Sequence, residues 1–481
     1  MCSALVPRLA RAQLGPDGAP ITTNDYAIDT YQGPVLASTR VIGLAGAYVA
    51  VGEFVEGNTQ NPAAPAVRPD YGRDHVDYDI GVGFTFPGTI TGTDFFNTGK
   101  SHTNLPATAQ DGFVFFELSG NLQLGPWGIG GAGSVQQYGL ESSQDSSDKL
   151  RTTLAVYDVQ LARAFYDGQL LVGLGARLGS MNVFNTNSQV QAGGSLFQSF
   201  GVAPELGALF RPNGQNYRLG LSFRAPLESG VANQSGAGNV LYPDSDSPLY
   251  LPSRVTSPWQ LGAGAAYRAG RTFNPEWIDP ADLTRPLRER LAERERERQR
   301  ERDHAHAQPD PNSRTRHARL NALDARLRDE RARDLAELAR VERETRALLG
   351  ERFAAMNRHY LLISTAVFLD GPVENAVGIE SFFERIVNRS GQEVTVSPRL
   401  GVESEVIPYW LIVRAGTYLE PTRFASNEAG ARLHATTGFD VRLGAWNVFG
   451  AWPNSYVWRL RTSFDAARDY FNWGLAIGGF Y

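Results

Sequence analysis

The stretch that decides the fold class is Asn472-Trp473-Gly474-Leu475-Ala476-Ile477-Gly478-Gly479-Phe480-Tyr481. Large side chains at 473, 475, 477 and 481 alternate with small or polar ones, and the stretch ends on aromatic residues. Because a strand points alternate side chains to opposite faces, one face here needs an apolar environment and the other a polar or packed interior. In a bilayer, only a closed sheet satisfies every backbone group of such strands. The stretch therefore predicts the closing strand of a transmembrane β-barrel.

The same period of two recurs along the chain, in segments that are separated by turn residues. The clearest segment is the first, where Val76, Tyr78, Ile80, Val82, Phe84 and Phe86 share one face and Pro87-Gly88 ends the run. The pattern predicts an all-β, antiparallel barrel of about fourteen strands, an even number as in single-chain bacterial barrels. We expect strands 1–8 within residues 74–270 and strands 9–14 within residues 358–481.

Composition is consistent with this fold class and excludes others. No run of about eighteen apolar residues is present, which excludes a helical membrane protein. The formal net charge of −5 includes no sequence-wide basic field, so nucleic acid is not an expected partner. The single cysteine, Cys2, cannot form an internal disulfide.

Residues 1–12 have the features of the end of a secretory signal. Leu5, Val6 and Leu9 precede the small-residue pattern Ala10-Arg11-Ala12, but a basic start and a long apolar core are missing. We interpret the segment as a remnant signal peptide whose true start codon lies upstream. An ordinary disordered leader is the alternative.

Connection lengths predict how the barrel is oriented. Barrels of the outer membrane have short turns on the periplasmic side and long loops outside. Counted back from the C-terminus, the long connections near residues 88–111, 141–151, 183–196, 227–253, 371–391 and 420–431 all fall outside, and the short turns, such as Asp167-Gly168, fall on the periplasmic side. Strand pattern and loop length thus agree on a cell outer membrane location in a Gram-negative envelope.

One connection, residues 271–357, is long although this parity makes it periplasmic. Its Arg- and Glu-rich composition predicts a helix that breaks near Gln308–Ser313, followed by a second helix with a thin leucine stripe. We expect a helical periplasmic hairpin, either an arm that binds a periplasmic protein or a tolerated insertion whose helices cover each other. His304 and His306 would diverge on a helix, so no metal is expected there, and the sequence predicts no cofactor.

Before the first strand lies a segment rich in small residues, 38–51, followed by Asn61-Pro62-Ala63-Ala64. Such a segment can pack its backbone closely in a confined space, and Asn-Pro initiates turns. With Leu219-Gly220-Leu221-Ser222-Phe223-Arg224-Ala225-Pro226, Leu251-Pro252 and Arg414-Ala415-Gly416-Thr417-Tyr418, it resembles the FadL-like family of outer-membrane transporters for long-chain fatty acids and other hydrophobic compounds. The PorV-like proteins of type IX secretion form a related branch.

The resemblance implies a plug inside the barrel and a sideways exit into the membrane. The plug would span residues 13–73, with its motif at Gly43, Gly46, Asn61, Pro62 and Ala63. A kink in the third strand would form the lateral gate, and the third strand here contains Gly128, Gly130, Gly131 and Gly133. Simple close packing is the alternative reason for these glycines.

Strand parity turns a set of charged residues toward the lumen. A guanidinium pairs bidentately with a carboxylate, so some of them would bind the head group of an anionic ligand. The alternative is an interior network in which acids and arginines pair and brace the plug. The candidate ligand-binding residues are Arg224, Arg399, Arg414, His434, Arg459 and Arg461, and Glu403, Asp440 and Arg442 face the same way.

These features predict a channel for passive uptake of a hydrophobic small molecule, which leaves sideways into outer-membrane lipid. Apolar residues of the outer loop Leu227–Tyr250 would form a capture groove or an ordinary cap over the barrel. An enzyme is not expected, because the serine-elbow motif and any metal-ligand cluster are missing. A PorV-like scaffold or secretion partner that uses the helical arm is the main alternative.

Overall fold

A computed structural model describes residues 13–69, 72, 74–88, 93–99, 108–142, 149–185, 195–232, 240–241, 248–308, 313–424, 430–446 and 457–479. The chain divides into two compact units, which we describe separately. The first is drawn from Met1–Arg68, Tyr78–Pro275 and Asn357–Tyr481, and the second from Pro69–Asp77 and Glu276–Met356. The expected leader at residues 1–12, and Phe480 and Tyr481 of the expected closing strand, lie outside the described residues.

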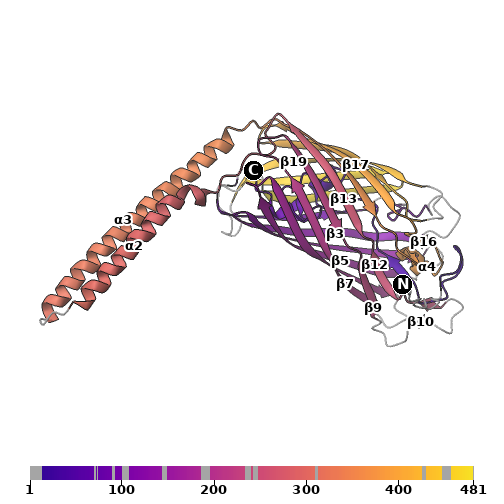
Figure 1. Cartoon of the computed structure of the whole chain (residues 1–481). Helices are drawn as coiled ribbons and strands as arrows, with labels where there is room; N and C mark the ends of the chain where they lie inside the picture. Colours follow the sequence, from indigo (N-terminus) through magenta and orange to yellow (C-terminus); the bar gives the residue numbers. More distant parts are fainter. Residues whose placement is uncertain are drawn as a thin grey trace, which may run out of the picture. The chain divides into compact units, whose positions relative to one another are not determined.

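The first unit is a closed antiparallel barrel of 14 strands (Figure 1). Pairing of the first strand with the last, in which Val82 lies opposite Ile477, closes the wall. The predicted all-β barrel fold is therefore confirmed. Its strands are β2 (Val76–Thr85), β3 (Thr108–Leu124), β4 (Trp127–Ser142), β5 (Lys149–Phe165), β6 (Leu170–Asn185), β7 (Ser195–Phe210), β8 (Tyr217–Arg224), β13 (Gln260–Ala269), β14 (Leu361–Asp370), β17 (Thr395–Ile407), β18 (Leu411–Glu420), β19 (Arg432–Ala445), β20 (Val457–Ala467) and β21 (Tyr470–Gly479).

Side chains alternate between the two faces of this wall, as the sequence predicts. On β8, Leu219, Leu221 and Phe223 are exposed on the outside, whereas Arg218 and Ser222 are buried inside. The strands are linked at one end by tight turns, such as the one in which Gly168 has a φ of 81°. An apolar exterior around a polar interior is the arrangement that a hydrocarbon environment favours.

A short N-terminal strand, β1 (Ala27–Asp29), completes the wall at the end that has the long connections. It lies parallel between β12 (Arg254–Ser257) and β15 (Ala376–Val377). β12 also pairs with β9 (Leu227–Ala232). The direct pairing of β13 with β14 begins only at Gln260 and Asp370, so β1 fills the wall beyond that point. The sequence pattern did not predict this insertion.

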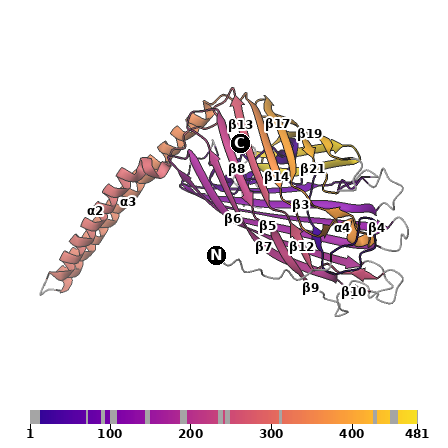
Figure 2. The ribbon, with the colours of Figure 1, turned by 45° about the vertical axis from the view of Figure 1, so that its right-hand side comes forward.

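Short elements cover the same end of the barrel (Figure 2). They are β10 (Val240–Leu241), β11 (Leu249–Tyr250), α4 (Ile379–Glu384) and β16 (Arg389–Ser390). Phe382 of α4 packs edge to face on Phe197 of β7, with 5.5 Å between ring centroids. The expected capture loop 227–250 is described only in part, because residues 233–239 and 242–247 lie outside the described residues.

Residues 35–67, which we call the inner segment, pack within the barrel. They contain α1 (Thr39–Gly43) and two 3-10 turns, η1 (Val55–Gly57) and η2 (Ala64–Ala66), and all residues of these elements are buried. Several wall glycines make this packing possible, because a Cβ added to them would overlap atoms of the inner segment. The glycines whose added Cβ would overlap its backbone or its Asn61 side chain include Gly128, Gly173, Gly207, Gly220 and Gly401.

The second unit is a pair of helices, α2 (Pro280–Ala307) and α3 (Ser313–Ala354). The Asp279 side chain caps α2 by accepting from the N–H of Ala281 at 2.8 Å. Ion pairs such as Arg288–Glu342 at 2.7 Å and Arg302–Asp324 at 3.3 Å join the two helices, and their order shows that the helices run antiparallel. Within the described residues, no helix is both long and apolar enough to span a membrane.

Candidate functional site

Asn61 fixes the expected N-terminal motif inside the barrel. It is fully buried, and its side-chain nitrogen donates to the backbone oxygens of Val49 at 2.9 Å and Ala208 at 3.1 Å. Its Oδ1 accepts from the N–H of Ala63 at 3.0 Å, which holds the turn at Pro62. One amide side chain thus joins two parts of the inner segment to strand β7 of the wall.

The two motif glycines leave room for wall arginines. Gly46 has a φ of 72°, and a Cβ there would overlap the Arg399 guanidinium. A Cβ on Gly43 would come within 3.2 Å of Arg414 Cδ. Larger residues at these two positions would therefore displace the inner segment or the arginines.

Arg40 of α1 starts an ion-pair network that we call the bracing network. Its guanidinium donates to Glu403 through Nε at 2.8 Å and Nη2 at 2.7 Å, and Nη2 also donates to Glu53 at 3.0 Å. Tyr48 Oη accepts from its Nη1 at 2.8 Å. Because a bidentate arginine–carboxylate pair is strong and directional, these bonds hold α1 against β17.

Glu53 extends this network along the wall to β13 and β8, two and three strands from β17. Arg268 of β13 donates to its Oε1 at 2.8 Å, and Arg218 of β8 lies 3.3 Å from the same oxygen. Both guanidinium groups also stack on Phe273, at 3.8 Å for Arg218 and 4.2 Å for Arg268. One carboxylate of the inner segment is therefore bound by arginines from two strands in addition to Arg40.

Three of the predicted ligand-binding arginines belong to the bracing network. Arg414 pairs with Glu403 and donates through Nη2 to Asp440 at 2.9 Å. Arg459 donates to the same aspartate at 3.1 Å, and Arg461 pairs with Glu56 of the inner segment. Their partners are buried carboxylates of the protein itself, as in the structural alternative that the sequence left open.

His434 is also fully bonded within the protein. Its Nδ1 lies 2.8 Å from Asp465 Oδ1 and its Nε2 lies 2.7 Å from Glu420 Oε2. The ring stacks on Tyr418 with 4.2 Å between centroids, and Arg432 pairs with Glu420. Both ring nitrogens are occupied and the side chain is buried, so His434 braces the wall between β18, β19 and β20.

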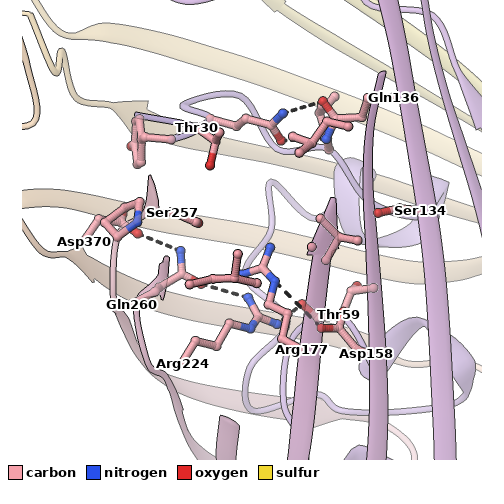
Figure 3. Close-up of a pocket in the computed structure, with 18 of the residues that line it drawn as sticks. Thr30, Thr59, Ser134, Gln136, Asp158, Arg177, Arg224, Ser257, Gln260 and Asp370 are labelled. Carbon is pink, nitrogen blue, oxygen red and sulfur yellow. Dashed lines mark hydrogen bonds and ion pairs between the residues drawn. The ribbon is translucent and has the colours of Figure 1, made fainter. Parts of the chain in front are cut away.

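The other two predicted residues, Arg224 and Arg399, line a cavity of about 170 Å³ in the lumen. Arg224 is labelled in the view of this cavity in Figure 3. Strands from both sides of the barrel contribute to it, and Thr30 to Leu36 and Thr59 of the N-terminal region form part of its lining. Arg224 donates through Nη1 to Gln260 Oε1 at 2.9 Å, and Gln260 donates to Asp370 at 2.9 Å. The cavity is thus polar on this side.

Charges around the cavity are less completely paired than those of the bracing network. Among the described residues, no carboxylate lies within 4 Å of the Arg399 guanidinium, which instead stacks on Phe368 at 4.1 Å. Arg177 Nε lies 3.8 Å from Asp158 Oδ1 and makes no hydrogen bond (Figure 3). The cavity therefore offers charged groups that a bound molecule or water has to satisfy.

The glycine-rich third strand is β4, and it is paired on both sides. Its register with β5 is unbroken from Trp127 to Glu141, and its register with β3 shifts only near Asp111 and Val114. Gly128 and Gly130 lie against Pro65 of the inner segment, whereas a Cβ on Gly131 would meet only ordinary contacts. A Cβ on Gly133 would lie 3.0 Å from the Tyr157 ring. Close packing thus accounts for two of the four glycines.

Sequence reasoning missed the cavity residues Glu117, Asp158, Arg177 and Gln260. Each follows the inward parity of its strand, so the signal was present in the alternation. Which inward residues face a cavity depends on the path of the inner segment, which no pattern of the wall strands reveals. Among the described residues, no group of three His, Cys, Asp or Glu side chains is arranged to hold a metal ion.

Fold and site together define a class of protein: a closed antiparallel barrel with its own N-terminal segment packed into the lumen. A search of protein-family models finds no match, and a search of curated proteins finds none either. Solved structures give matches at low identity.

A FadL homologue of Pseudomonas aeruginosa matches with a TM-score of 0.47 and 11% identity over 93% of this chain and 99% of its own. The toluene transporter TodX of P. putida matches at 0.44 and 12%, covering 93% and 98%. The monoaromatic hydrocarbon channel CymD matches at 0.43 and 10%, covering 92% and 96%. One of the three is thus a homologue of FadL, whose family the sequence motifs resemble. The fold assignment itself rests on the strand pairing.

Proposed function

We propose that this protein is an outer-membrane channel for passive uptake of hydrophobic small molecules, with long-chain fatty acids and aromatic hydrocarbons as candidate classes. The observation that carries the proposal is a lumen that contains a buried inner segment bonded to the wall, with a cavity beside it. In this view residues 13–73 act as a plug that prevents leakage. The apolar outer face of the wall supports a position in the membrane.

Exit into the membrane fits the energetics of an apolar cargo. Each buried methylene is worth about 0.8 kcal/mol, which a molecule would lose in a water-filled pore. Passage through the wall at β4 would require its pairing with β3 or β5 to open, because both registers are almost continuous. We propose this strand as the gate, with Gly131 and Gly133 as positions where the strand is least constrained by the inner segment.

Orientation and partners follow from the same proposal. The tight turns would face the periplasm and the long connections the outside, and by this parity residues 271–357 would lie on the periplasmic side. A periplasmic protein would be the partner of the helices in the alternative, PorV-like function. The ion pairs between the two helices lie at the surface, where such pairs contribute little stability. Charged side chains of this kind favour an arm that is surrounded by water.

Uptake measurements in deletion and complemented cells test the proposal. Cells that carry the wild-type gene should take up labelled fatty acid or toluene faster than deletion cells, and a variant without residues 276–356 should retain this difference. Equal uptake in wild-type and deletion cells, together with absence of bound hydrophobic ligand in the purified barrel, would reject it. Loss of a periplasmic protein partner on removal of residues 276–356, with uptake unchanged in deletion cells, would favour the secretion-partner function.

A further inference from the structure

Two acidic side chains face the cavity from neighbouring parts of the wall. Glu117 of β3 is 2% exposed, and its Oε2 has no hydrogen-bond partner. Asp158 of β5 is 7% exposed, and its Oδ1 likewise makes no hydrogen bond. Ser134 of β4 lies opposite Glu117 in the ladder and lines the cavity between the two strands (Figure 3). These residues, Glu117, Ser134 and Asp158, form what we call the acidic wall.

The acidic wall differs from two other carboxylates of the lumen, Glu53 and Glu205. Glu53 is bound by three arginines, and Glu205 accepts from Gln160 and lies 3.4 Å from Arg224. Within the described residues, no arginine, lysine or histidine nitrogen lies within 4 Å of the Glu117 carboxylate, and Asp158 has only the loose contact with Arg177 at 3.8 Å. A buried carboxylate oxygen without a donor is costly, so Glu117 Oε2 and Asp158 Oδ1 favour a donor from a bound molecule or water.

We infer that the acidic wall is a subsite for the protonated amino group of a small ligand. An ammonium group donates up to three hydrogen bonds and carries the charge that two carboxylates attract. The serine hydroxyl between the strands supplies a further acceptor. This inference rests on the proposed uptake function and gives its substrate class: small apolar molecules that bear an amine.

Cavity size sets the size of the ligand. The cavity of about 170 Å³ is close to the roughly 150 Å³ of a protein cavity that holds benzene. One aromatic ring with a short amine therefore fits, and Phe115 and Leu154 offer apolar lining beside the acidic wall. Benzylamine, benzoate and toluene share this ring and differ only in the head group, which makes them matched probes.

Calorimetric titration of the full-length protein in lipid nanodiscs tests the inference, with empty nanodiscs subtracted. We expect benzylamine to bind about tenfold more tightly than benzoate, and Glu117→Gln to weaken benzylamine binding about tenfold while toluene binding stays unchanged. Asp158→Asn should weaken benzylamine binding in the same direction. Glu228→Gln, the same chemical change at an exposed residue of β9, is the matched control and should behave as wild type.

The outcomes separate this inference from the proposed function. If toluene binds but benzylamine binds no better than benzoate, the acidic wall is not an amine subsite, although the channel proposal stands. The same conclusion follows if Glu117→Gln folds and leaves benzylamine affinity unchanged, because water alone would then satisfy the carboxylates. If none of the three probes binds, the inference fails, and the proposed function is then decided by fatty-acid uptake in wild-type and deletion cells.

Discussion

Two polar regions lie inside the same barrel, and they differ in how their charges are paired. In the bracing network, Arg40, Glu53, Glu403 and Arg414 each contact at least two oppositely charged groups. Around the cavity, Arg399 has no carboxylate within 4 Å among the described residues. Inward-facing charge alone therefore does not identify a ligand site. The pairing of each charge separates residues that hold the inner segment from residues that are available to a ligand.

The strongest test of this comparison is Glu403→Gln. Removal of this carboxylate leaves the Arg40 and Arg414 guanidinium groups buried without their shared partner, and we expect a loss of about 3–5 kcal/mol in stability. Thermal unfolding of the purified barrel, monitored by the loss of its β-sheet circular dichroism signal, measures the effect. Glu228→Gln serves as the control, and an equal, small change in both variants would mean that the network does not brace the inner segment.

A second test adds one methyl group at the wall. In Gly173→Ala the new Cβ would overlap the backbone at Pro62, so we expect a loss of about 1–3 kcal/mol and a higher single-channel conductance as the inner segment shifts. Gly230→Ala is the matched variant, because a Cβ there meets no atom within 4 Å. Conductance in planar bilayers reports the difference. Identical conductance of both variants and wild type would show that the inner segment does not block the lumen.

Substitution of a cavity arginine should affect ligand binding and leave stability almost unchanged, the opposite of a substitution in the bracing network. Arg399→Gln removes a charge that makes no ion pair among the described residues, so we expect a stability change below about 1 kcal/mol. Its effect should lie in ligand binding, because the cavity loses one of its three lining arginines. Thermal unfolding and benzoate titration of the same preparation test both statements. Destabilisation as large as that of Glu403→Gln would remove the distinction between the regions.

The smallest effect on stability is expected for the ion pairs of Asp334 in the helical unit. They serve as a water-exposed reference for the buried pairs of the barrel. Burial would raise the pKa of Asp334, but hydrogen bonds from Arg298 and Arg294 outweigh it and lower the pKa. A lowered pKa in the folded state gives stability that is present above the ordinary carboxyl pKa of about 4 and is lost as the pH falls through the folded value.

Hydrogen exchange of the α2 and α3 amides in the full-length protein measures this loss. We expect less protection below about pH 4, by under 1 kcal/mol, and a reduced pH dependence in Asp334→Asn. Helix protection that is the same at neutral and acidic pH in wild type would contradict the assignment.

The strand pattern predicted the wall because its signal is local. Outward residues such as Leu475 and Ile477 need hydrocarbon, and their period of two survives any change in the neighbours. Inward parity also placed Arg224, Arg399 and Arg414 in the lumen. Which of these arginines form ion pairs was not predictable from the sequence. Arg414 pairs with Glu403 and Asp440 of neighbouring strands. The surroundings of Arg399 depend on the path of the inner segment.

The position of β1 could not be predicted from the sequence for a related reason. Ala27–Asp29 is too short to show an alternation, and its partners lie about 230 and 350 residues further along the chain. The glycines of β4 posed another problem, because a small residue permits either a kink or a close neighbour. Only the position of Pro65 gives Gly128 and Gly130 a packing role.

The strand β1 also constrains the order of assembly. Its two neighbours, β12 and β15, are separated by the whole α2–α3 region, so this part of the wall cannot be sealed until residue 377 has arrived. Such distant partners cost loop-closure entropy before any contact repays it, which slows the last step of folding. Residues 27–29 therefore stay without both strand partners until the chain has been made as far as Val377.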